Sequence, residues 1–205
     1  MSERDLGIHI TNDLKWKTQA QHASNRANAV LGSLKRTFTI WNIQTTLILY
    51  TSFVRPHLEY AVSAWNPYQK QSIKILERVQ RRATKLIPSI RNLSYETRLK
   101  ILGLTTLKER RKRGDLIQYY KISKGYNNVD WYHPNALTNS LNQSGPASNI
   151  RGMKHRLKRQ ITNCPSRENF FINRIVSFWN ELPFDIVNAA SINLFKNKYD
   201  EFIKK

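Results

Sequence analysis

The stretch that decides the fold runs from residue 70 to residue 113 and reads KQSIKILERVQRRATKLIPSIRNLSYETRLKILGLTTLKERRKR. It holds fourteen Lys or Arg and three acids, a net charge of +11 within a chain total of +20. In its first half, apolar residues recur at the spacing of one helix face: Ile73, Leu76, Val79, Ala83, Leu86 and Ile87. Basic residues fall within an arc of roughly 120° on the opposite side. They are Lys70, Lys74, Arg78, Arg81, Arg82 and Lys85.

This predicted helix has one face suited to burial and one suited to contact with anions. Charged helix faces are usually only solvated, but solvated faces commonly mix both signs of charge. Glu77 is the only acid between residues 70 and 87. We therefore favour an anion-binding face over a merely solvated one.

The composition of the whole chain narrows the class of partner. With 205 residues, 40% of them hydrophobic, the chain can bury a core in one large or two small domains. A pI near 10.3 indicates a polyanionic partner, with nucleic acid first and an anionic membrane surface second. No apolar run approaches the ~20 residues that span a bilayer, so no membrane span is expected. A single cysteine, Cys164, and no recognisable signal peptide predict a nuclear or cytoplasmic protein.

Helical periodicity extends through the segments that precede this stretch. It predicts a helix over residues 16–38 with an apolar stripe rich in alanine. The other face of that helix is either ordinary solvated surface or a surface that follows a nucleic-acid backbone. Asn42 is a predicted N-cap of a second helix, which Pro56 interrupts. Its inward residues are expected to be Leu47, Tyr50, Phe53 and Val54.

Capping signals also mark the helices that follow. Ser94 is expected to cap a short helix that Gly103 ends. Thr106 and Glu109 form a capping box that begins a helix, and Gly125 ends it.

The two ends of the chain have different patterns. Residues 6–10 predict a short strand or half-hairpin, followed by a turn at Asn12, that needs a sheet from another polypeptide. Residues 126–150 predict a loop or linker, and residues 151–164 a small hairpin. Two helices are expected to follow. The first buries the side chains of Phe171 and Trp179, and the second is capped by Ser191. We interpret Trp65 and Trp179 as core anchors rather than base-stacking platforms.

The residues that catalysis would require do not form a recognisable pattern. No two aspartates are adjacent, and a polymerase needs clustered acids to hold its two metal ions. The sequence has no glycine-rich phosphate loop and no cluster of Cys and His with zinc-ligand spacing. We therefore expect no catalytic residue, no metal site and no cofactor.

Several ordered motifs resemble the carboxyl-terminal part of reverse transcriptases from non-long-terminal-repeat retrotransposons, and the jockey-like and chicken-repeat-like groups are the most similar. The motifs span nearly the whole chain. They are Asp5-Leu-Gly-Ile8, Leu14-Lys-Trp16, Leu31-Gly-Ser-Leu-Lys-Arg-Thr-Phe38, Val54-Arg-Pro-His-Leu-Glu-Tyr60, Leu76-Glu-Arg-Val-Gln-Arg-Arg-Ala-Thr-Lys85, Arg113-Gly-Asp-Leu-Ile117, Phe170-Phe171, Ser177-Phe-Trp-Asn-Glu-Leu-Pro183 and Ala190-Ser-Ile-Asn-Leu-Phe-Lys196.

The resemblance implies a mainly α-helical fold with a thumb-like bundle. Residues 1–15 would be the end of the palm near the primer grip, 16–125 the thumb, 126–150 a linker and 151–205 a carboxyl-terminal extension. The fold would thus combine a short N-terminal strand remnant with a small β-hairpin before a C-terminal helical pair. The fingers, the palm with its catalytic Asp-Asp and the endonuclease domain are not in this sequence. We expect a truncated element copy, a partial gene product or a co-opted remnant.

These observations favour a non-catalytic, largely sequence-independent nucleic-acid-binding fragment of an RNA-directed DNA polymerase. Its ligand would be RNA, an RNA–DNA hybrid or a DNA duplex, and a separate palm and fingers polypeptide would be a further partner. The alternatives are a basic module that docks an acidic protein or an anionic membrane, and an enzyme in its own right. The predicted nucleic-acid-binding residues are Lys70, Lys74, Arg78, Arg81, Arg82, Lys85, Arg110, Arg111 and Arg113. Because residues 110–113 surround their helix, some of them are expected to be solvated or paired with Asp115.

Overall fold

A computed structural model describes residues 2–129, 156–157 and 159–204 of the chain. The chain is mainly helical, as predicted, and begins with a two-stranded hairpin. It divides into two compact units, and the division falls between Arg111 and Lys112, inside one continuous helix. The resemblance placed a boundary at residue 125, where that helix has already ended.

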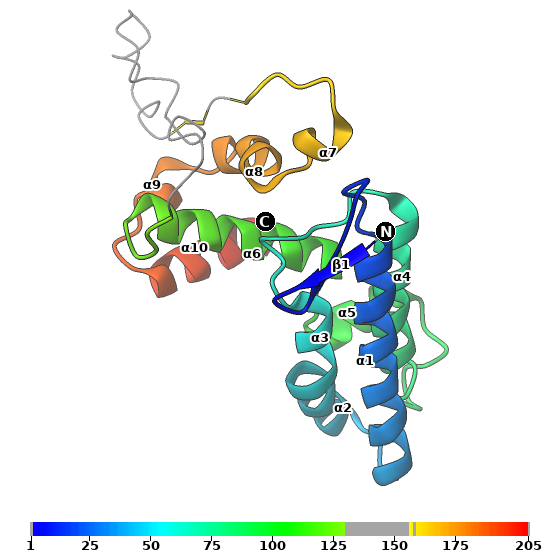
Figure 1. The fold of residues 1–205 in the computed structure, drawn as a ribbon. Helices are drawn as coiled ribbons and strands as arrows, with labels where there is room; N and C mark the ends of the chain where they lie inside the picture. The colour runs from blue at the N-terminus through cyan, green and yellow to red at the C-terminus, as the bar shows by residue number, and fades with distance from the viewer. Residues whose placement is uncertain (1, 130–155, 158, 205) are drawn as a thin grey trace, which may run out of the picture. The chain divides into compact units, whose positions relative to one another are not determined.

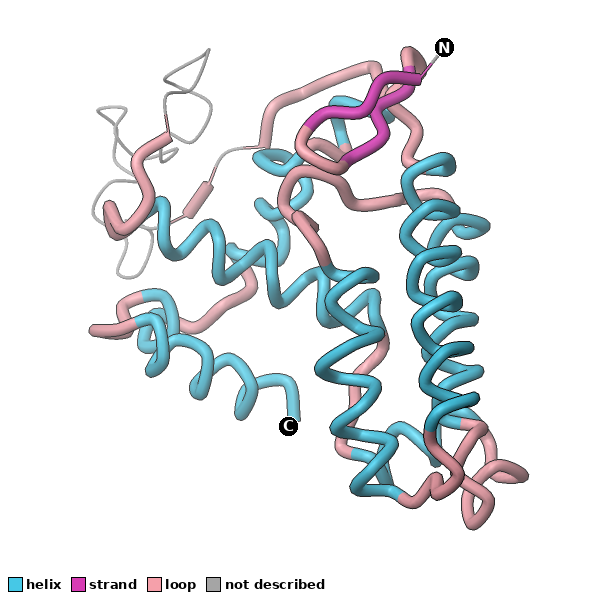
Figure 2. Tube along the Cα trace, turned by 60° about the horizontal axis from the view of Figure 1, so that its bottom comes forward, coloured by secondary structure: helices cyan, strands magenta, loops and turns pink. Residues whose placement is uncertain are grey.

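The first unit contains the hairpin and most of the helices (Figures 1 and 2). Its elements are β1 (Ser2–Asp5), β2 (Ile8–Thr11), α1 (Lys17–Thr37), α2 (Ile43–Leu49), the π-helical turn η1 (Tyr50–Val54), α3 (Arg55–Glu59), α4 (Lys70–Thr84), α5 (Tyr95–Leu102) and the first turn of α6 (Leu107–Ser123).

The hairpin differs in detail from the expected short strand or half-hairpin over residues 6–10. Asp5 pairs with Ile8, so Leu6 and Gly7 form the two-residue turn. Both have positive φ, +43° and +83°, which is the backbone of the tight turns that match strand twist. The glycine therefore lies in the turn, and β1 forms the second strand that the sequence did not predict.

The hairpin packs on helices in place of the expected partner sheet. Ile8 is buried against the first unit's core. The His9 backbone N–H donates to Oε1 of Gln19 on α1 at 2.9 Å, and the Tyr60 hydroxyl donates to the Leu6 carbonyl at 3.0 Å. Among the described residues no third strand joins the sheet.

The core of the first unit forms where α1, α3 and α4 meet. The small side chains of Ala20 and Ala27 are fully buried, which lets α1 lie close beside α4 (Figure 1). Leu58, Trp65 and Leu76 are also fully buried, so the prediction that Trp65 is a core anchor is confirmed.

The helix that begins at Asn42 does not end at Pro56 but changes its hydrogen-bond pattern. The Arg55 N–H donates to the Tyr50 carbonyl, five residues back, and Pro56, which has no N–H, begins α3. The π turn shifts the helical register, so Phe53, predicted inward, is 53% exposed. Tyr50 and Val54 are buried, as predicted.

The predicted caps are confirmed. The side chains of Asn42 and Ser94 accept from the backbone N–H three residues later, at 2.8 and 3.2 Å. Gly103 ends α5 in the left-handed conformation, with φ +61°. Thr106 and Glu109 form the capping box of α6, each backbone N–H donating to the other's side chain.

The second unit comprises the rest of α6 and four later helices: α7 (Pro165–Glu168), α8 (Phe171–Asn180), α9 (Phe184–Val187) and α10 (Ile192–Lys204). Its core is aromatic. Tyr119 meets Trp179 edge to face and Tyr120 stacks on Phe195, both with ring centroids 4.5 Å apart. Trp179 is buried, as predicted.

The linker expected over residues 126–150 falls largely outside the described residues. Of the hairpin expected over residues 151–164, residues 156–157 and 159–164 are described, and they contain no β-strand. Within the part of the chain that is described, no helix has the length and apolarity that crossing a membrane requires.

Candidate nucleic-acid interface

Helix α4 has the two faces that its sequence predicted. Leu76, Val79 and Ala83 are buried in the core, while Ile73 is half-buried. All six predicted basic residues are exposed, and they form the surface that we call the basic face: Lys70, Lys74, Arg78, Arg81, Arg82 and Lys85. The structure thus brings together the larger part of the predicted site.

The cations of the basic face follow one another along the helix. Lys70, Lys74, Arg78 and Arg82 are spaced four residues apart, so each lies one turn from the next. Among the described residues, none of these four has an ion pair with an acid. Their charge is available to an anion from solution.

Glu77, the single acid of α4, does not interrupt this face because its side chain points inward. One carboxylate oxygen accepts from the Leu107 backbone N–H at 3.0 Å, at the N-terminus of α6. The other accepts from the Tyr95 hydroxyl. A carboxylate there satisfies a free N–H of the first helical turn and complements the helix dipole. The basic face is therefore free of acids.

A buried glutamine fixes α4 to its neighbours. Gln80 is fully buried, accepts from the Tyr50 hydroxyl at 2.6 Å, and donates to the Tyr95 hydroxyl and the Thr105 carbonyl, each at 2.9 Å. Burial raises the pKa of both tyrosines, and the hydrogen bond to Glu77 adds to the rise for Tyr95. Both hydroxyls thus remain protonated donors, and they hold the buried side of α4 in one register.

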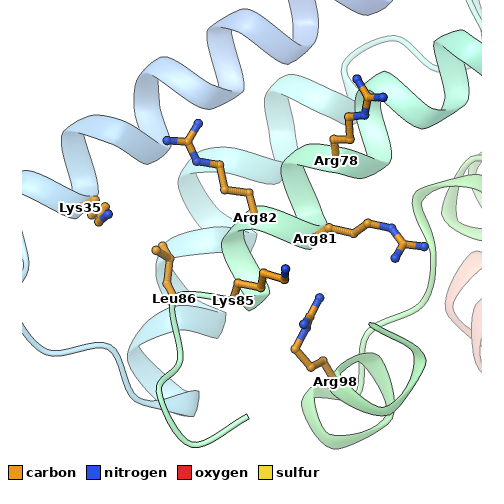
Figure 3. A pocket seen from close by; sticks show the side chains of 7 residues that line it. All are labelled: Lys35, Arg78, Arg81, Arg82, Lys85, Leu86 and Arg98. Carbon is orange, nitrogen blue, oxygen red and sulfur yellow. The ribbon is translucent and has the colours of Figure 1, made fainter. Parts of the chain in front are cut away.

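The C-terminal half of the basic face borders an open pocket of about 440 Å³ (Figure 3). Six of the seven side chains around it are basic. They are Lys35, Arg78, Arg81, Arg82, Lys85 and Arg98, and the seventh is Leu86. Lys35 comes from α1 and Arg98 from α5, so three helices contribute to the pocket.

Two arginines of this pocket are held in place by the protein. Arg98 is buried; its Nε donates to the Thr84 hydroxyl at 3.1 Å, and it also donates to the carbonyls of Arg91 and Leu93. The Arg81 guanidinium lies 3.9 Å from the ring centroid of Tyr95. Arg81 also has a long, exposed ion pair with Glu96, 3.9 Å between nitrogen and oxygen, which contributes little.

The second predicted basic cluster makes internal contacts. Arg110 donates to both carboxylate oxygens of Glu59, and Arg113 donates to both of Asp200, at 2.6 and 2.7 Å. Arg111 is buried and donates to the Leu58 carbonyl at 2.9 Å. Arg110, Arg111 and Arg113 therefore stabilise their own units, and we leave them out of the interface.

Asp115, which was expected as a partner for some of residues 110–113, is bonded by an arginine of another helix. The Asp115 carboxylate is buried and accepts from two nitrogens of Arg174, at 2.8 and 2.9 Å. A two-point pair of this kind connects α6 to α8 inside the second unit.

No metal site is found among the described residues, because nowhere do three His, Cys, Asp or Glu side chains converge. The single cysteine, Cys164, is exposed. Among the described histidines, His9 and His22 lie together, and their rings stack with centroids 3.8 Å apart.

Comparisons with known proteins give one weak relation and no assignment of function. The chain is 29% identical over 146 residues to an uncharacterized protein of Caenorhabditis elegans, an alignment that covers 66% of this chain and 69% of that protein. No family model matches the sequence, and no solved structure matches the fold.

Proposed function

We propose that this chain is a non-catalytic nucleic-acid-binding module that holds a duplex through the basic face of α4. The observation that carries the proposal is an exposed helix face with six cations and no acid. Neutralising phosphates with Lys and Arg releases counterions, which favours binding without reading sequence.

The dimensions of α4 suit a phosphate backbone. From Lys70 to Lys85 a helix rises about 22 Å, at 1.5 Å per residue. Duplex DNA carries one negative charge per about 1.7 Å of its axis, so the helix passes more phosphates than it has cations. A duplex that lies along the helix therefore presents enough phosphate charge for the cations of the basic face to neutralise.

We further propose that the parent activity is RNA-directed DNA synthesis by a retrotransposon reverse transcriptase. This part of the proposal rests on the sequence motifs quoted above. The chain alone is expected to position a duplex and not to extend it, because it lacks the adjacent aspartates that hold catalytic metals. A palm and fingers polypeptide would supply them.

The decisive experiment measures how duplex affinity depends on salt. The test variant replaces Arg78, Arg81, Arg82 and Lys85 with Gln. The control variant removes the same amount of charge from exposed positions outside the basic face: Arg4, Lys100, Lys108 and Lys204. The test variant should flatten the log–log slope by about 0.9 per lost contact on B-form duplex, and the control should barely change it.

The same experiment separates the alternatives. Equal affinity and slope in both variants would show that the basic face is only solvated and would refute the proposal. Binding to anionic vesicles or to an acidic protein, with none to duplex, would assign the face to that other partner. Leu76→Asp provides a folding control, since a charge in the core should unfold the unit that the Gln variant leaves intact.

A further inference from the structure

We infer that the pocket between α1, α4 and α5 binds a compact polyphosphate group, such as the 5′-triphosphate end of an RNA strand or free polyphosphate. The inference extends the proposed function, because four of the six basic side chains of the pocket also belong to the basic face.

The charge around the pocket exceeds what a backbone phosphate can neutralise. Six cationic side chains surround one opening, and a single long ion pair, from Arg81 to Glu96, is the only ion pair seen for them among the described residues. A backbone phosphodiester carries one negative charge, and its neighbours lie further along the strand. A ligand with several charged phosphates in succession places its charge where the cations converge.

The directions of the side chains support a single ligand. Figure 3 shows Lys85 from α4 and Arg98 from α5 directed toward one another across the space between their helices. Two cations directed at one another repel, and an anion placed between them removes that repulsion. The volume of about 440 Å³ lies within the range of small-ligand sites.

The pocket is partly organised before a ligand arrives. Arg98 is fixed by its bonds to Thr84, Arg91 and Leu93, and Arg81 lies over the Tyr95 ring. Side chains that are already positioned lose less conformational entropy on binding. The planar guanidinium of Arg81 can donate two hydrogen bonds to phosphate oxygens, while Arg98, whose Nε and Nη1 are bonded to the protein, contributes its charge and its Nη2.

The pocket offers little to other anions of similar charge. Leu86 is its one apolar lining residue, so no group of hydrophobic side chains is present to hold a lipid chain. The carboxylates of an acidic peptide carry one charge each on separate side chains, whereas a phosphate monoester alone carries about −1.5 to −2. The pocket therefore favours clustered phosphates.

The experiment compares affinities for the same short RNA duplex with a 5′-triphosphate and with a 5′-hydroxyl end, in the full chain. Tripolyphosphate, inorganic phosphate and sulfate compete at matched ionic strength. Lys35→Gln changes the pocket alone, and Lys70→Gln with Lys74→Gln changes only the part of the basic face outside it. Lys100→Gln, on α5 but outside the pocket, is the control for loss of one charge.

The wild-type chain should prefer the triphosphate end, and Lys35→Gln should reduce that preference roughly threefold to tenfold. The Lys70 and Lys74 variant should weaken both duplexes equally and leave their ratio unchanged. Tripolyphosphate should compete far better than phosphate or sulfate. If the triphosphate preference survives competition by tripolyphosphate, the end of the strand is read elsewhere and the inference fails.

Failure of the inference and failure of the proposed function give different results. Equal affinity for both ends, with salt-dependent duplex binding retained, overturns the pocket alone. Tripolyphosphate binding without any duplex binding overturns the proposed function and leaves the pocket as a site for free polyphosphate.

Discussion

The buried Gln80 makes a quantitative prediction about what holds the basic helix in place. In Gln80→Leu the side chain keeps a similar size but loses its polar atoms, so the buried Tyr50 hydroxyl loses its acceptor. The Tyr95 hydroxyl keeps its bond to Glu77, and the Thr105 carbonyl, which belongs to an exposed residue, loses one donor. One orphaned buried donor should lower the free energy of unfolding of the first unit by about 2 kcal/mol.

A double-mutant cycle tests the reasoning. Tyr50→Phe removes the orphaned hydroxyl, so the double variant should recover much of the loss, with a coupling energy of about 1 kcal/mol. Urea unfolding of the full chain, followed by hydrogen–deuterium exchange of α4 peptides, reports the first unit separately from the second. A loss in Gln80→Leu below about 0.5 kcal/mol, or strictly additive single variants, would show that the network does not hold α4.

Three further predictions concern ionisation and chemistry. Because the pKa values of Tyr50 and Tyr95 are raised from 10.0 in the folded chain, the unfolded chain loses these protons first. The free energy of unfolding should therefore be unaffected by these tyrosines below pH 10 and should fall above it by about 1.4 kcal/mol per pH unit for each tyrosine. In alkaline urea titrations, Tyr50→Phe should remove the part of this fall that Tyr50 contributes. An unchanged slope of stability against pH would contradict this expectation. Partial burial, with His22 and Arg4 nearby, lowers the pKa of His9 from 6.5, so the docked hairpin should lose amide protection as pH falls through 6.5 but not above it. Protection factors at residues 8–11, corrected for the intrinsic pH dependence of exchange, that stay constant across this range would exclude the effect. Finally, the purified chain should incorporate no nucleotide on a primed RNA template with magnesium, and extension that is abolished by substituting an acid of this chain would refute the non-catalytic assignment.

Local signals in the sequence were enough to predict the basic face and the helix caps. The period of Leu76, Val79 and Ala83 fixed which side of α4 is buried, and therefore which side carries the cations. Capping depends on residues three or four apart, so Ser94 and the Thr106–Glu109 box were predictable without knowledge of the tertiary fold.

Contacts between distant segments were not predictable. The pocket needs Lys35 and Arg98 from two other helices, and no spacing along the chain places them beside α4. Gln80 has no pattern that distinguishes a buried glutamine from a solvated one. Arg110 pairs with Glu59, 51 residues away, and Arg113 pairs with Asp200, 87 residues away. The basic run at residues 110–113 therefore showed where positive charge is concentrated, but not which groups that charge contacts.

The four-residue spacing of Lys70, Lys74, Arg78 and Arg82 has a cost for the free protein. Like charges one helical turn apart destabilise a helix by about 0.2–0.5 kcal/mol for each pair, and the inward position of Glu77 leaves the row without compensation. Added salt screens this repulsion, but it also weakens the attraction to phosphates. Ionic strength should consequently shift melting temperature and duplex affinity in opposite directions. A polyanion bound along these four cations neutralises their repulsion and binds the folded state, so the helix should be most stable when its ligand is present.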